Sequence, residues 1–246
     1  MVSGEVTAAG RAVPGADPVA VTVVVPVHNE QRLLPHCLRA IRRAAAAVPV
    51  PVHTIVVLDA CSDDSRSRVP DWAHAVPIGA RNVGRARATG FDHAAATWRN
   101  LDARAVWYAT TDADSVVPAD WLTGQLRHAR TADLVAGTVA VRWREHRPAV
   151  RAEYERRYRA NRTAQHGHVH GANLGFRAAC YHAVGGFAAL PAGEDVDLVS
   201  RLRRAGARTV WPEHPAVLTC DRRDNRVEGG FGGYLRDLAD ATPDCA

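Results

Sequence analysis

Asp112 and Asp114 are separated by a single residue and directly follow the apolar segment Val106–Ala109. Two carboxylates in a turn at the end of a strand can converge on one hard cation such as Mg²⁺ or Mn²⁺, which also accepts phosphate oxygens and water. A D-x-D pair by itself is more often a solvated turn. The preceding strand favours the functional interpretation, because it places two acids at the edge of the sheet where ligands bind.

Four further segments carry residue types suited to a nucleotide site. V-P-V-H-N-E ends at Glu30, and V-L-D-A-C-S-D-D-S contains Asp59. A purely structural role suits each segment equally well: a strand-end turn with Glu30 in the first turn of a helix, and an Asx-type turn followed by a helix cap. Residues 79–90 combine small residues with arginines at a predicted helix start, which suits a diphosphate. Gly193-Glu194-Asp195 precedes another predicted helix and offers a carboxylate as a general base, although acids are frequent at helix starts.

Buried strands alternate with helices through the first half of the chain, which predicts parallel strands joined by crossover helices. Ligands of such sheets lie beyond the C-terminal ends of the strands. That rule selects three polar, acid-rich loops, Pro26–Glu30, Asp59–Ser65 and Thr110–Ser115. The predicted strands are Val19–Val27, Thr54–Leu58 and Ala105–Ala109, with helices over 31–47 and 83–98 and a loop over 77–80.

The second half changes in character and is predicted to supply the pocket for the other substrate. We treat 19–246 as one domain, in which 19–115 form a nucleotide-binding lobe and 116–246 a lobe for the other substrate. Residues 1–18, rich in Gly, Ala and Pro without a period, are predicted to be a disordered leader. The remaining predicted elements are strands over 134–141 and 171–176 and helices over 150–161, 196–205 and 234–239.

The composition and spacing of residues argue against several other classes of protein. The five cysteines are widely spaced and form no CxxC pair, which argues against a disulfide scaffold and a zinc site and favours a cytoplasmic location. The chain has a formal net charge of +5, but its arginines are dispersed, so no nucleic-acid partner is expected. No apolar run reaches the about 18 residues of a membrane span, and no secretion signal is evident. Peripheral membrane contact and the oligomeric state stay open.

Taken in order, these segments resemble the family-two glycosyltransferases from about Val21 to Arg204. The matching motifs are V-P-V-x-N-E, V-x-D-x-x-S-D-D-S, R-N-x-G, D-A-D, G-A-N-L-G-F-R and G-E-D. The resemblance implies an α/β chain with the GT-A fold, a Rossmann-like, mostly parallel sheet flanked by helices with an acceptor-binding lobe. It also implies a nucleoside-diphosphate sugar donor, with a UDP-sugar favoured, a divalent cation, a hydroxyl acceptor and inversion at the anomeric carbon.

The resemblance also assigns roles to residues. Asp114 would bind the metal directly, with Asp112 near the metal and the ribose. Asp195 would be the catalytic base with Glu194 in support, and Asn173 and His170 would face the acceptor. The residues assigned to the donor are Pro26, Asn29, Glu30, Asp59, Arg81, Arg87, Asp112 and Ala113.

The chain departs from the family pattern in ways that bear on the kind of enzyme and on the metal ligands to be expected. There is no Q-x-x-R-W motif, and Arg142-Trp143 precedes the G-E-D, which argues against a processive polysaccharide synthase. No third metal ligand is evident, although His214 and Asp221 are candidates that also suit ordinary loops. His168 and His170 alternate before a strand, a pattern more typical of one buried and one exposed side chain than of a metal site.

Two other functions compete with glycosyl transfer. A nucleotidyltransferase that makes nucleotide sugars would carry a Gly-rich loop with basic residues after the first strand, where this chain has His28-Asn29-Glu30. A nucleotide-sugar binder without catalysis would not need Asp112, Asp114 and Asp195 together.

Overall fold

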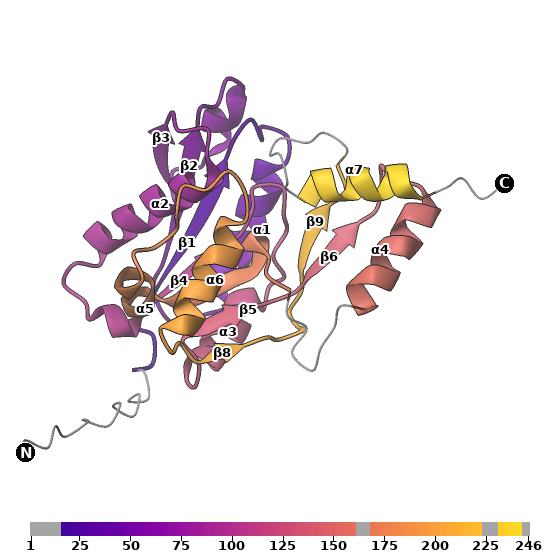
Figure 1. The fold of residues 1–246 in the computed structure, drawn as a ribbon. Coiled ribbons are helices and arrows are strands. Elements are labelled where there is room, and N and C mark those ends of the chain that lie inside the picture. The colour runs from indigo at the N-terminus through magenta and orange to yellow at the C-terminus, as the bar shows by residue number, and fades with distance from the viewer. Residues whose placement is uncertain (1–15, 161–167, 223–230, 243–246) are drawn as a thin grey trace, which may run out of the picture.

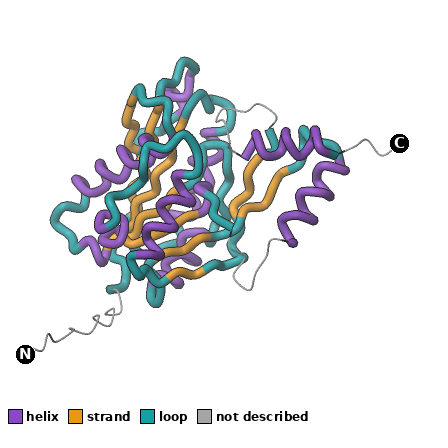
Figure 2. Tube along the Cα trace, in the orientation of Figure 1, coloured by secondary structure: helices purple, strands orange, loops and turns teal. Residues whose placement is uncertain are grey.

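The computed structural model describes residues 16–160, 168–222 and 231–242, so most of the predicted leader lies outside the described residues. A seven-stranded sheet forms the centre of the molecule (Figures 1 and 2). Its strands are β1 (Ala20–Val27), β2 (Val52–Asp59), β3 (His74–Ile78), β4 (Val106–Thr110), β5 (Leu134–Ala136), β7 (Leu174–Arg177) and β8 (Thr209–Val210). They lie in the order β3-β2-β1-β4-β7-β5-β8.

The sheet is mostly parallel, as predicted. β1 pairs in parallel with β2 and β4, and β3 extends the parallel set at one edge. β7 runs antiparallel between β4 and β5, and β8 pairs in parallel with β5. The C-terminal ends of β1, β2 and β4 therefore meet at one edge, where the predicted site residues follow.

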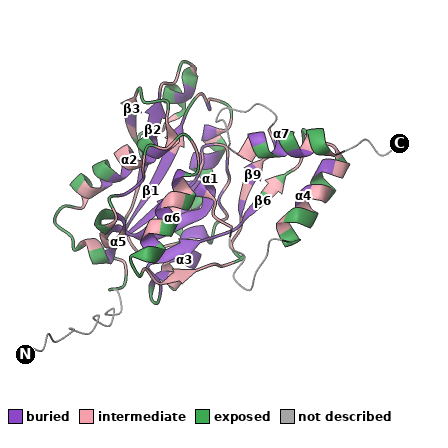
Figure 3. Ribbon diagram, in the orientation of Figure 1, coloured by how far each residue is buried: buried purple, intermediate pink, exposed green. Residues whose placement is uncertain are grey.

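Helices cover both faces of the sheet. One face carries α1 (Leu34–Ala46) and α3 (Trp121–Ala129), and the other carries α2 (Val83–Thr97), α5 (Ala178–Ala183) and α6 (Glu194–Arg204). Within β1, Val23 and Val25 pack into the first layer and Val24 into the second, because successive side chains point to opposite faces. Figure 3 shows the resulting buried centre, which explains the unbroken apolar run of this strand.

A smaller unit adjoins the main sheet (Figure 1). β6 (Val139–Arg142) and β9 (Val217–Cys220) pair in parallel as a two-stranded sheet. Beside them lie α4 (Pro148–Ala160) and α7 (Phe231–Ala241), which share a small apolar cluster around Val150, Tyr154 and Leu235.

The structure corrects two predicted elements. The segment 77–80 is not all loop, because Pro77 lies in β3, an edge strand that tolerates a residue without an N–H. Residues 134–141 are not one strand, because the chain leaves the main sheet at Gly137, where the Asn173 side chain fills the space of a Cβ atom. Strands β8 and β9 and helices α3 and α5 had no prediction, and the predicted strand over 171–176 begins as a 3₁₀ turn, Gly171–Asn173.

No helix in the described ranges has both the length and the apolar character needed to cross a bilayer.

Candidate active site

Asp59 ends β2 and organises the start of α2. Its two carboxylate oxygens accept hydrogen bonds from the backbone N–H groups of Arg81 and Asn82, each at 2.8 Å. The side chain is buried, so these two bonds satisfy an acid that would otherwise be costly to bury. The structure therefore shows Asp59 fixing the 79–82 loop at the sheet edge, and its contact with a nucleotide base stays a prediction.

Residues with a left-handed backbone conformation lie in the same loops. Asn29, Ala60 and Arg81, with φ of 54°, 49° and 50°, are the non-glycine residues with positive φ in the described chain. The Asn29 side chain accepts hydrogen bonds from the N–H groups of Ser62 and Asp63 and so ties the end of β1 to the loop after β2. Each such residue costs about 1–2 kcal/mol. Strain of this kind clusters at functional sites, where the surrounding structure over-determines the backbone.

Arg87 joins three elements beneath this edge. From α2, its guanidinium forms ion pairs with Asp112 after β4, at 2.6 Å, and with Glu194 at the start of α6. The Arg87 side chain is only 3% exposed, and Glu194 meets it in a water-poor environment, whereas the Asp112 side chain is 38% exposed. Gly171 lies against the guanidinium so closely that a Cβ atom there would require the guanidinium to move. Arg87 thus holds the D-A-D turn and the G-E-D turn together, and its predicted donor contact stays a prediction.

Asp114 and Glu30 share a second arginine that the sequence did not single out. Arg222, just after β9, forms ion pairs with Asp114 and with Glu30, the latter at 2.7 Å. Burial opposes the charged form of Arg222, but Asp114 and Glu30 outweigh it and raise its pKa. The Cys220 thiol also lies 3.4 Å from Asp114. The available signal in the sequence was the pair of consecutive arginines at 222 and 223. No local pattern indicated that a strand before them would place Arg222 at this edge.

Carboxylates cluster at this edge of the sheet. Among the residues that the structure describes, five carboxylates, those of Glu30, Asp112, Asp114, Glu194 and Asp195, lie around the Arg87 and Arg222 guanidiniums, and Arg142 and Arg144 line a pocket together with Asp114. Burial, and after it the neighbouring acids, raise the pKa of Asp112 to about 6 against the influence of Arg87. Clustered carboxylates repel a diphosphate unless a cation accompanies it.

The two aspartates fit a cation that shares its coordination with a ligand. Asp112 and Asp114 offer hard oxygen donors in one turn, and Mg²⁺ is commonly held by one or two carboxylates plus substrate phosphates. The described residues contain no group of three or more acid, cysteine or histidine side chains able to hold a metal by themselves. Asp221, a candidate third ligand, is buried and accepts hydrogen bonds from three successive backbone N–H groups, those of residues 144–146.

Asp195 lies in the first turn of α6, half-buried, beside the Arg87 bridge. One carboxylate oxygen accepts a hydrogen bond from the Gly171 N–H at 2.7 Å, and the other accepts from the Val196 N–H at 2.8 Å. These bonds orient the carboxylate and leave lone pairs for a further partner. Glu194, the other half of the predicted pair, is buried against Arg87, so it supports the turn rather than facing open space.

The two predicted acceptor residues differ in placement. Asn173 is buried, accepts a hydrogen bond from the Trp121 indole and donates to the Thr138 and Pro215 carbonyls. It therefore joins α3 to the segments that lead into β6 and β9. His170 is partly buried, and its Nε2 lies 3.4 Å from the Tyr158 hydroxyl. His168 stacks on Tyr158 with ring centroids 4.1 Å apart. Acceptor contact by either predicted residue stays a prediction.

The remaining predicted residues lie at the same edge. Pro26 is in β1, paired with Val57 of β2, and Ala113 is buried between the two aspartates. The Arg81 side chain is exposed at the rim, next to its left-handed backbone. The structure therefore brings the predicted donor, metal and base residues together at one end of the sheet.

Comparisons with known proteins agree with this geometry. The profile of glycosyl transferase family 2 matches residues 22–184. No curated protein matches the chain. Among solved structures, the mannosyltransferase PcManGT from Pyrobaculum calidifontis, in complex with GDP-Man and Mn²⁺, is 20% identical, with a TM-score of 0.62 over 92% of this chain and 70% of that one.

A second solved structure is S. aureus TarS 1–349 in complex with UDP-GlcNAc. It is 12% identical, with a TM-score of 0.60 over 90% of this chain and 66% of that one, so this chain spans just under two thirds of its length. At these identities the two structures show a shared fold. The family profile covers more than half of the chain, and the chain therefore belongs to glycosyl transferase family 2, as a glycosyltransferase with the GT-A fold.

Proposed function

We propose that this enzyme transfers a sugar from a nucleoside-diphosphate sugar, with a UDP-sugar favoured, to a hydroxyl acceptor in a reaction assisted by Mg²⁺ or Mn²⁺. The observation that carries the proposal is the cluster at one sheet edge, where five carboxylates of the described chain gather around Arg87 and Arg222. A diphosphate bound there requires a cation, and two of the acids form a turn suited to holding it. The GDP-Man and Mn²⁺ bound by PcManGT, and the UDP-GlcNAc bound by TarS, support the same ligand class.

Residues 19–115 would form the donor lobe and 116–246 the acceptor lobe. Asp112 and Asp114 would hold the cation, which when bound supplies Lewis-acid stabilisation of the leaving diphosphate. Arg81, exposed at the start of α2, would approach the diphosphate or the base, and Pro26, Asn29 and Glu30 would line the nucleoside. Asp59 would hold the loop on which the base rests.

Asp195 would act as the general base. It takes the proton of the acceptor hydroxyl while that oxygen forms a bond to the anomeric carbon. The bond from this carbon to the diphosphate oxygen breaks, and its electron pair stays on the diphosphate. A single displacement of this kind inverts the anomeric configuration. General-base assistance is worth about 10²–10⁴ in rate, and holding the two substrates in line contributes further.

A reducing cytoplasm is the compartment we propose. The four cysteines in the described part of the chain, Cys37, Cys61, Cys180 and Cys220, are all free thiols. Disulfides are rare in reducing compartments, so free thiols are compatible with one.

A donor-hydrolysis screen tests the proposed function. The protein is incubated with UDP-glucose, UDP-galactose, UDP-N-acetylglucosamine or GDP-mannose, with Mn²⁺ or with EDTA, and the released nucleotide is measured. We expect slow hydrolysis of at least one donor with Mn²⁺ and none with EDTA. Tight donor binding without hydrolysis or transfer would indicate a silent binder. Formation of a nucleotide sugar from a nucleoside triphosphate and a sugar phosphate would indicate a nucleotidyltransferase.

A further inference from the structure

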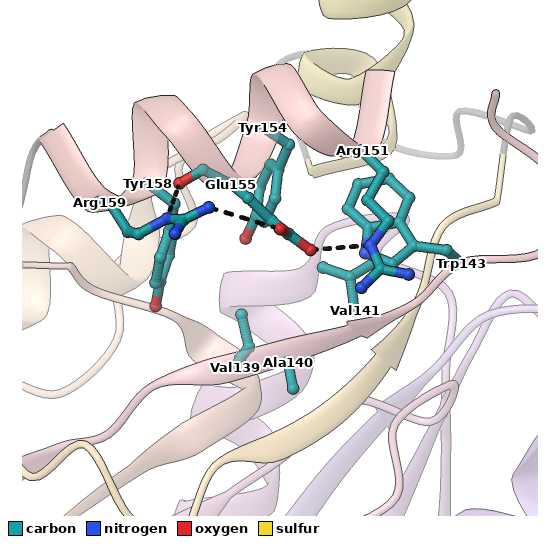
Figure 4. Close-up of a pocket in the computed structure, with 9 residues that line it drawn as sticks. All are labelled: Val139, Ala140, Val141, Trp143, Arg151, Tyr154, Glu155, Tyr158 and Arg159. Carbon is teal, nitrogen blue, oxygen red and sulfur yellow. Dashed lines mark hydrogen bonds and ion pairs between the residues drawn. The ribbon is translucent and has the colours of Figure 1, made fainter. Parts of the chain in front are cut away.

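A cavity of about 500 Å³ lies between α4 and β6 (Figure 4). Its volume falls within the about 300–1,000 Å³ typical of small-molecule sites. Three aromatic side chains line it: Trp143 follows β6, and Tyr154 and Tyr158 extend from α4 toward the strand. The other lining residues are Val139, Ala140, Val141, Arg151, Glu155 and Arg159.

Residues on both walls of the cavity contact segments that reach the proposed active site. On the α4 wall, the Tyr158 hydroxyl lies 3.4 Å from His170, and the next residue, Gly171, donates its N–H to Asp195. On the other wall, β6 pairs with β9, whose last residue, Cys220, lies 3.4 Å from Asp114. The lining of the cavity is therefore connected to the candidate base through His170 and Gly171, and to the candidate metal ligand through β9.

The Tyr154 hydroxyl is buried and has no hydrogen-bond partner among the described residues. It points away from α4 toward β6 in Figure 4. Burial, with smaller contributions from Tyr158 and Tyr234, raises the pKa of this phenol, so the hydroxyl stays protonated and able to donate. A buried polar group without a partner is unfavourable, and a ligand oxygen would satisfy it.

Charged side chains form the rim of the cavity. Glu155 lies between two arginines on α4, 2.8 Å from Arg151 and 3.6 Å from Arg159. A pocket for an alkyl chain would not need an ionic rim or a buried hydroxyl. Aromatic faces combined with Arg and Glu at the edge suit a ring that has apolar C–H faces and hydroxyl groups at its edge, which is the surface of a sugar.

We propose that the cavity between α4 and β6 binds the acceptor, and that the acceptor presents a sugar ring to it. This inference rests on the proposed function. Trp143 and Tyr158 would contact the apolar faces of the ring, and the Tyr154 hydroxyl would donate to one of its oxygens. The acceptor hydroxyl would then reach Asp195 at the Tyr158–His170 end.

Binding of simple glycosides tests the inference without turnover. Methyl glycosides of glucose, galactose, mannose, rhamnose and N-acetylglucosamine are titrated by NMR into the full chain with UDP and Mn²⁺ present. We expect saturable binding of at least one glycoside. W143A should weaken it at least about tenfold, and Y154F, which keeps the ring, about threefold to tenfold. The matched controls W72A, at an exposed tryptophan outside the cavity lining, and Y234F, at a tyrosine of the same aromatic cluster that does not line the cavity, should stay within about twofold.

Two results would overturn the inference. One is that no glycoside binds although UDP does. The other is that W143A and Y154F, each retaining UDP binding as proof of folding, bind the glycoside as tightly as the unmodified protein. Failure of the proposed function is distinct, because the unmodified protein would then bind neither UDP nor GDP with Mn²⁺ and would hydrolyse no donor.

Discussion

Asp195 carries the proton transfer in the proposed reaction, and its partners are two backbone N–H groups. Asp195→Asn keeps the shape and one oxygen acceptor but cannot take a proton at neutral pH. We expect turnover to fall at least about a hundredfold with donor affinity nearly unchanged. The control is Asp197→Asn in the same helical turn, where the carboxylate pairs with Arg201. If Asp195→Asn retains more than about a tenth of the turnover with binding intact, the base assignment is wrong and Glu194 is the next candidate.

Arg222 places a positive charge on Asp114, where a divalent cation is proposed to bind. Because the guanidinium and the metal repel each other, Arg222→Gln should tighten Mn²⁺ binding to the nucleotide-free protein at least about tenfold, or about 1.4 kcal/mol. Electron paramagnetic resonance of free Mn²⁺ measures this directly. Arg130→Gln removes a charge from an exposed, distant pair and should leave the affinity unchanged. Equal or weaker Mn²⁺ binding by Arg222→Gln would place the cation away from Asp114.

Ala60 follows Asp59 and has a φ of 49°, a conformation that glycine adopts without steric cost. Ala60→Gly should therefore raise the free energy of unfolding by about 0.5–1 kcal/mol, after the greater chain entropy of glycine is subtracted. Urea denaturation measures the change. The same substitution at Ala96, an exposed residue near the end of α2, should lower stability instead. A loss of stability at position 60 would show that the methyl group there makes a contact that outweighs the strain.

At the scale of elements, Arg87 fastens α2 to the start of α6 and to the turn after β4. Arg87→Met removes the positive charge but leaves Glu194 buried and unpaired. Breaking a buried pair in this way costs about 3–5 kcal/mol, and chemical denaturation should show a loss of that size. Arg104→Met, which breaks an exposed pair with Asp102, should cost less than about 1 kcal/mol.

The Arg87 experiment also has a clear negative outcome. A loss below about 1 kcal/mol for Arg87→Met would mean that the two turns are held by packing alone. Gly84 in α2 packs against the Ala188 carbonyl and Glu194 so closely that a Cβ atom there would clash.

At the scale of the whole molecule, nucleotide binding should stabilise the fold only when a cation is present. UDP at about 100 times its Kd should add about 2.7 kcal/mol and raise the Tm by about 5–10 °C with Mn²⁺. EDTA should abolish the shift, because without a cation the clustered carboxylates repel the diphosphate. UMP, with one phosphate fewer to share with the cation, should give a smaller shift. A UDP shift that is identical with Mn²⁺ and with EDTA would contradict the metal-assisted site.

Most of the donor half, apart from β3, could be predicted from the order of its residues. Apolar runs such as 19–27 mark strands buried on both faces, and parallel strands must end at a common edge. The acids that follow β1, β2 and β4 could therefore be placed together from the order of residues alone. Asp114 and Asp195 belonged to motifs that the family resemblance already joined.

The pairing of distant charges, in contrast, depends on the packed fold. Arg222 is 108 residues from Asp114, and Arg87 is 107 residues from Glu194. Such pairs depend on how β9 and α6 pack, which no local pattern records. The strand predicted over 134–141 failed for the same reason, since β5 and β6 pair with different partners on either side of Gly137. Periodicity reports the local environment of a segment, whereas pairing between distant segments is settled by the free energy of the assembled fold.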